Sequence, residues 1–188
     1  GGIFSYALAR ALHERGDPLG LVMLFYTPLP SIYDSVSLDD DVKFLFDLGK
    51  FANWFSGSDI DVDKLSYDEL RTMDDSTRWE FALQIAKTHG AVPPDTSTDH
   101  IRRVVEAAMS HARMIRNYKI AAFDQPVHLV RPEQPDVLSR MTGQTLGPDL
   151  GWGDVIGDWL RLHTAPGDHF SLLQGGNAAQ LAELVNAC

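Results

Sequence analysis

A stretch of roughly 80 residues, from about Ser37 to Tyr118, contains no convincing strand yet lies between two short apolar runs. The runs Leu19 to Tyr26 and Pro126 to Val130 lack the alternation of a half-exposed strand, which is typical of strands buried on both faces. A crossover between neighbouring parallel strands needs only about a dozen residues. The chain is therefore expected to have an α/β fold into which a helical subdomain is inserted.

Three further segments extend the α/β part. Helical periodicity predicts a first helix over Ile3 to Arg15 and a closing helix over Ala178 to Val185. Between them, a third strand is predicted over Trp159 to His163. The expected division is an α/β core of residues 1–35 and 121–188 around an insertion of residues 36–120. On the first helix, the stripe expected to be buried is Ile3, Phe4, Ala7, Leu8, Ala11 and Leu12.

Within the insertion, the sequence predicts four helices. The first carries the apolar stripe Phe44 to Phe55, and the second begins at the capping box Ser66-Tyr67-Asp68-Glu69. A second such box, Thr77 to Glu80, begins the third helix. The fourth starts near Asp99, and its expected buried face is Ile101, Val104, Val105, Ala108, Ala112, Ile115 and Tyr118.

Composition excludes several classes of function. The 188 residues include 26 acidic and 16 basic side chains, a net charge of −10, which argues against a nucleic-acid or anionic membrane surface. No apolar run approaches the ~18 residues of a membrane span. Cys188 is the only cysteine, so no intrachain disulfide forms and a reducing, cytoplasmic location is expected. No histidine pair has zinc-binding spacing, so no metal is expected.

The two glycines at the start lead directly into a helix. In the G-x-S-x-G nucleophile elbow of α/β-hydrolases, glycines let a strand turn sharply into a helix behind the nucleophile. Interpreted this way, Gly1 and Gly2 are the last glycines of an elbow, and the nucleophile lies two residues before Gly1. Serine is expected there, and cysteine is compatible with the visible residues. The oxyanion-binding N–H of the following residue would also precede Gly1.

A histidine follows the last predicted strand in the motif Pro166-Gly167-Asp168-His169. A loop beyond the carboxyl end of a strand can place an imidazole over the sheet edge, where α/β folds bind their ligands. There His169 would act as a general base, taking the proton of the nucleophile and returning it to the leaving group. The alternative is a loop histidine without a role.

These segments occur in an order and spacing that resembles the thioesterase domains of nonribosomal peptide and polyketide synthetases, which are α/β-hydrolases. The resemblance implies a thioesterase that releases an acyl or peptidyl chain by hydrolysis or macrocyclisation through an acyl-enzyme. It implies no bound cofactor, a substrate held on the phosphopantetheine of an acyl or peptidyl carrier protein, and a lid formed by the insertion. The segments that carry it include Gly1-Gly2, Tyr6 to Ala9, Leu21 to Phe25 with Thr27-Pro28, Gly151-Trp152, Pro166 to His169 and Leu181-Ala182.

One position departs from the family pattern. Tyr26 stands at the strand end where the family usually places its catalytic aspartate, and a tyrosine cannot supply the anion that stabilises an imidazolium. Some relatives carry the acid one strand later, where this chain offers Asp136 and Glu133, and Asp136 is favoured. The alternative for both is an exposed turn carboxylate. Trp152 and Tyr26 are assigned to the substrate channel, with plain packing as the alternative for Trp152.

Three functional hypotheses remain. The first is a thioesterase domain whose partners are a carrier protein and the rest of its own hydrolase domain, upstream of Gly1. The second is a free-standing editing thioesterase of the same fold. The third, raised by Tyr26, is a catalytically impaired module that only binds a carrier or another partner.

Overall fold

A computed structural model of the chain describes residues 1–35, 38, 40–47, 66–88, 90, 92–134, 145–169 and 171–188. The chain divides into two compact units. The first consists of Gly1–Ile32 together with Asn117–Cys188, and the second of Tyr33–Arg116.

The first unit is built on a three-stranded parallel sheet. Its strands are β1 (Met23–Phe25), β2 (Val127–Pro132) and β3 (Leu160–Ala165), in the order β1-β2-β3. The predicted strands are thus confirmed, and the α/β class with them. β2 is longer than expected, because Arg131 and Pro132, interpreted as turn residues, pair in register with Thr164 and Ala165 of β3.

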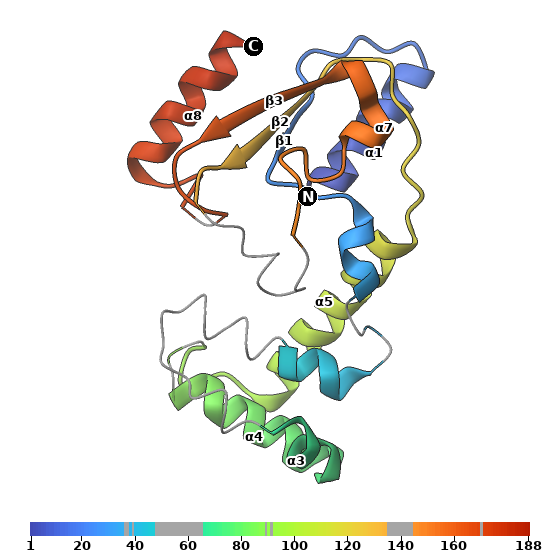
Figure 1. The fold of residues 1–188 in the computed structure, drawn as a ribbon. Coiled ribbons are helices and arrows are strands. Elements are labelled where there is room, and N and C mark those ends of the chain that lie inside the picture. Colours follow the sequence, from blue (N-terminus) through green and yellow to red (C-terminus); the bar gives the residue numbers. More distant parts are fainter. Residues whose placement is uncertain are drawn as a thin grey trace. The chain divides into compact units, whose positions relative to one another are not determined.

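Helices lie against both faces of this sheet (Figure 1). On one face, Val130 and Ala165 form a buried cluster with Leu172 and with Leu181 of α8 (Gly175–Ala187). Leu24 and Leu129 point to the opposite face, the side of α1 (Gly2–Glu14), and are fully buried. β2 is thus buried on both faces, with Leu129 and Val130 each fully buried, which explains its nearly continuous apolar run in the sequence.

The buried face of α1 differs from the expected stripe. Ile3, Tyr6 and Ala9 are buried, whereas Phe4 is 55% and Leu8 60% exposed. The helix is apolar around most of its circumference, so periodicity alone could not select the face. Tyr6 can be buried because its hydroxyl donates a hydrogen bond to the Ala121 carbonyl at 2.8 Å, and burial raises the pKa of Tyr6 to about 12.

Short elements at Pro30–Ser35 (η1), Gly153–Ile156 (α7) and Gly157–Trp159 (η3) accompany these strands and helices. In the part of the chain that the structure describes, no helix is both long enough and apolar enough to cross a membrane.

The regular elements described in the second unit are all helices. Residues 41–47 are helical, and α3 (Tyr67–Thr72), α4 (Asp75–Thr88) and α5 (Thr98–Asn117) follow. Two arginines of α5 bind neighbouring segments: Arg102 forms an ion pair with Asp75, and Arg113 Nε donates a 2.9 Å hydrogen bond to the Leu38 carbonyl. The core of this unit contains Leu45, Trp79, Val105 and Met109.

Two details of these helices correct the sequence interpretation. Ser66 caps α3 as predicted, accepting a hydrogen bond from the Glu69 N–H. However, α4 begins at Asp75, because the Asp74 carboxylate accepts hydrogen bonds from both the N–H and the hydroxyl of Thr77. The predicted buried face of α5 is wrong at two positions: Val104, which it included, is 52% exposed, and Met109, which it left out, is buried. Most of the predicted stripe from Phe44 to Phe55 lies outside the described residues.

Candidate active site

The carboxyl ends of the three strands bring together candidates from separate parts of the sequence. Tyr26 directly follows β1, Glu133 directly follows β2, and His169 lies in the loop after β3. Because the strands are parallel, these positions meet at one edge of the sheet. Ligands of open α/β folds bind at this edge.

The turn that carries His169 is fixed by its neighbours. Gly167 has φ +96°, and a Cβ there would lie 2.6 Å from Asn177 Nδ2 and 2.7 Å from Ser171 Oγ, so only glycine fits. Asp168 Oδ1 accepts hydrogen bonds from the N–H and the hydroxyl of Ser171, both at 2.8 Å. The exposed His169 side chain therefore projects from a closed, internally bonded turn.

Tyr26 packs against His169. The two ring centroids lie 5.1 Å apart at an interplanar angle of 58°, and Tyr26 is only 4% exposed. Its backbone has φ +40° and donates a 2.7 Å hydrogen bond to the Val130 carbonyl. Its buried hydroxyl has no hydrogen-bond partner among the described residues. The residue directly after β1 is thus a tyrosine that contacts the histidine through its ring.

The turn after β2 is bonded to the histidine loop through the backbone. The Glu133 N–H donates to the Ala165 carbonyl and the Gln134 N–H to the Gly167 carbonyl, each at 3.0 Å. The Glu133 side chain is exposed, and Asp136 lies outside the described residues. The structure therefore brings the acid-bearing turn to the histidine loop, while the choice between the two carboxylates stays a prediction.

The start of α1 lies against the end of β1. A Cβ on Gly2 would lie 2.6 Å from Thr27 Cγ2 and 2.7 Å from Thr27 Cβ, so the close approach of the loop requires glycine there. Gly1 has no such neighbour. The first turn of α1 contains no acidic residue and its N-cap makes no side-chain hydrogen bond, which leaves its N–H groups available to an anion.

Trp152 lies in the core of the first unit. It is 0% exposed, its Nε1–H donates a 2.6 Å hydrogen bond to the Thr27 carbonyl, and its ring packs 4.8 Å from that of Tyr6. Full burial leaves no Trp152 surface for a substrate, which favours the packing alternative. The hydrogen bond nevertheless supports the loop that contacts Gly2.

Comparison with solved structures shows which proteins have a similar fold. One similar structure is holo-AB3403, a four-domain nonribosomal peptide synthetase bound to AMP and glycine, with a TM-score of 0.73 and 21% sequence identity. The match covers 100% of this chain and 14% of the synthetase chain. The Vlm2 thioesterase domain with genetically encoded 2,3-diaminopropionic acid, bound with a dodecadepsipeptide, matches in space group P1 with a TM-score of 0.55 and 18% identity. The chain has the fold of a thioesterase domain.

The thioesterase fold is only partly spanned by this chain. The match to the Vlm2 thioesterase domain in space group P1 covers 100% of this chain and 62% of that domain's chain. A second structure of the same domain, in space group H3, matches with a TM-score of 0.53 and 19% identity, and this match covers 98% of this chain and 64% of the other. No protein-family model and no curated protein matches the chain. The likeness to thioesterase domains is therefore one of three-dimensional structure.

Several features of the site were not predicted from the sequence. The contact of Gly2 with Thr27 and the ring contact of Tyr26 with His169 join residues far apart in the chain, so no local pattern indicates them. The Asp168–Ser171 turn is different, because an aspartate three residues before a serine is a recognisable turn signal. That spacing could have predicted a fixed histidine loop.

Proposed function

We propose that this chain forms part of a thioesterase that releases an acyl or peptidyl chain from the phosphopantetheine of a carrier protein. The observation that carries the proposal is the position of His169. It projects from a closed turn at the carboxyl edge of the sheet, against the residue that follows β1. The thioesterase fold provides the context in which a histidine at this edge acts on a thioester.

In the proposed mechanism, a serine upstream of Gly1 attacks the thioester carbonyl, and His169 takes the hydroxyl proton. The tetrahedral intermediate collapses as the C–S bond breaks, and His169 returns the proton to the departing pantetheine thiol. The resulting acyl-enzyme is then attacked by water, which yields an acid, or by an internal amine or hydroxyl, which yields a ring. His169 takes the proton of this second nucleophile and returns it to the serine.

Two structural features support the proposed partners. In the described part of the chain, β1 is hydrogen-bonded to a neighbouring strand on one side only, and the apolar side chains of Phe4 and Leu8 are exposed on α1. We infer that the remainder of the hydrolase domain covers these surfaces. The helical unit Tyr33–Arg116 is proposed to be the lid over the acyl chain, and no bound cofactor is required.

A catalytically impaired binding module is the second candidate, and Tyr26 is the observation that favours it. The ring that contacts His169 cannot replace a carboxylate electrostatically. A carrier or acyl chain would still bind at the same edge, without turnover.

Acylation kinetics of the complete hydrolase domain separate these two functions. With a chromogenic thioester, the thioesterase is expected to release a burst of thiol equal to the enzyme concentration, followed by slower turnover. A fluorophosphonate should label the same nucleophile in one-to-one ratio. Binding of a carrier protein without a burst and without labelling would instead establish the binding module.

The identity of the acid gives a second prediction. Asp136→Asn is expected to lower kcat for thioester release by roughly 10⁴-fold if Asp136 orients His169, as loss of the triad carboxylate does elsewhere. Glu133→Gln serves as the matched control and should leave kcat nearly unchanged. The reverse result would assign the acid to Glu133. If neither variant changes kcat, neither residue is the acid.

A further inference from the structure

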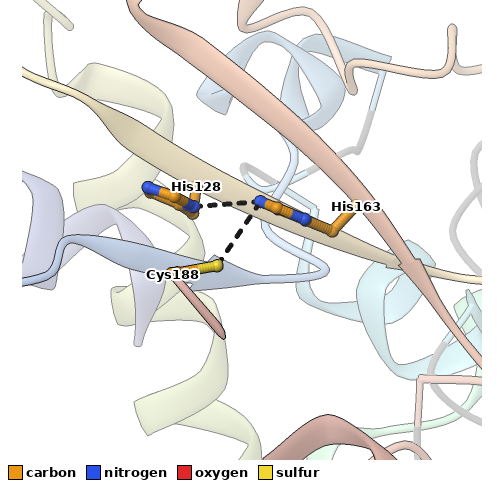
Figure 2. Close-up of side chains that lie close together, drawn as sticks. All are labelled: His128, His163 and Cys188. Atoms are coloured by element: carbon orange, nitrogen blue, oxygen red, sulfur yellow. Dashed lines mark hydrogen bonds between the residues drawn. The ribbon is translucent and has the colours of Figure 1, made fainter. Parts of the chain in front are cut away.

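Three side chains with metal-binding atoms lie together on the sheet face covered by α8. His128 Nδ1 is 2.9 Å from His163 Nε2, and Cys188 Sγ is 3.9 Å from the same His163 nitrogen (Figure 2). The three ligand atoms all lie within 4.8 Å of one another. Both histidines are partly buried and the cysteine is exposed.

Strand register explains why the two histidines meet. His128 of β2 pairs with Arg161 of β3, and His163 pairs with Val130, so the histidines are diagonal neighbours on the same face. Their rings are stacked, 5.1 Å apart and within 6° of parallel. The last turn of α8 then brings Cys188 over this pair. Three separate elements thus contribute one ligand each.

Two imidazoles and a thiolate form a ligand set that zinc uses in proteins, with a fourth position left for water. At usual bond lengths, tetrahedral zinc separates two nitrogen ligands by roughly 3.3 Å and a nitrogen from a sulfur by roughly 3.6 Å. The observed separations of 2.9 and 3.9 Å are each within half an ångström of these values. We propose that His128, His163 and Cys188 form a binding site for Zn²⁺.

The fourth position has a route to solvent. A pocket of about 260 Å³ is lined by Leu19 to Val22, Gln125 and Pro126, and by the two ligands His128 and Cys188. A water molecule can enter there and complete the tetrahedron. The two histidine ligands lie within β2 and β3, whereas Tyr26 and His169 lie beyond strand ends. The metal site is therefore separate from the proposed thioesterase chemistry.

Metal binding requires a defined rearrangement of protons. Without metal, one of the two facing ring nitrogens carries the hydrogen of their mutual hydrogen bond. Binding of Zn²⁺ moves that hydrogen to the other nitrogen of the same ring and releases the thiol proton of Cys188 to water.

Titration of the metal-free complete protein with Co²⁺, a spectroscopic substitute for Zn²⁺, tests the proposal. We expect one equivalent to bind, with the visible absorption of a tetrahedral site and a thiolate-to-cobalt charge-transfer band, and Zn²⁺ to displace it. Cys188→Ser should remove the charge-transfer band. His163→Gln and His128→Gln should each weaken binding more than about 10-fold, since outer partners of zinc ligands alone contribute 10- to 100-fold.

His111→Gln provides the matched control, because His111 is an exposed histidine on α5 in the other unit. It should leave the Co²⁺ spectrum and affinity unchanged. Cys188→Ser changes an exposed residue at a helix end, so circular dichroism should show an intact fold even if a histidine variant unfolds. Absence of binding, or a charge-transfer band that persists in Cys188→Ser, would overturn the proposal.

Discussion

Replacing His169 with alanine is expected to lower kcat/KM for thioester release by about 10²- to 10⁴-fold, the usual contribution of a general base. The imidazole is the group that takes the nucleophile's proton in the proposed mechanism. Because its side chain is exposed on a turn held by Gly167, Asp168 and Ser171, its removal should not unfold the domain. Steady-state hydrolysis of a thioester by the complete hydrolase domain measures the effect, with fluorophosphonate labelling as a second readout.

The matched control for this experiment is His111→Ala on α5, which removes an exposed imidazole from the other unit. It is expected to retain full activity and labelling. The assignment of the general base would be wrong if His169→Ala retained parental kcat/KM, or if both variants lost activity equally.

Replacing Trp152 with alanine is expected to lower the free energy of unfolding by about 3–5 kcal/mol, as for other fully buried tryptophans. The substitution removes a side chain that is 0% exposed and packs against Tyr6. It also leaves the Thr27 carbonyl without its 2.6 Å hydrogen bond. Urea denaturation of the complete hydrolase domain, followed by circular dichroism, measures the change.

Trp152→Phe separates packing from a role in the substrate channel. It keeps an aromatic ring and removes the donor to Thr27, so the expected loss of stability is about 1–3 kcal/mol. If Trp152 only packs, the relative rates for short and long acyl thioesters should not change. A shift in acyl-chain preference with unaltered stability would restore the channel assignment.

The α/β class was predictable because β2 is buried on both faces of the sheet, with Leu129 on one face and Val130 on the other, both fully buried. Such burial leaves a nearly uninterrupted apolar run in the sequence. The face of α1 was not predictable. Phe4 and Tyr6 are both large and aromatic, and only the hydrogen bond of Tyr6 to Ala121, 115 positions away, distinguishes them. The start of α4 was misplaced because Asp74 caps the helix, where the sequence also offered Thr77.

The candidate site was predictable only where a local sequence pattern indicates it. The position of His169 followed from a local motif after a strand, and the structure places it at the expected sheet edge. The cluster of His128, His163 and Cys188 depends on the register of two strands and on where a helix ends. Periodicity and motif spacing contain no information on register, so no zinc site was expected.

The two backbone hydrogen bonds from Glu133 and Gln134 to the histidine loop have an evolutionary consequence. They continue the pairing of β2 with β3 past the strand ends, so the main chain, independently of any acidic partner, holds the loop that carries His169. A carboxylate could therefore be supplied to the imidazole from either neighbouring strand end without any change in the position of the loop. In the proposed triad, the acid would then be the member whose position in the chain can change most easily.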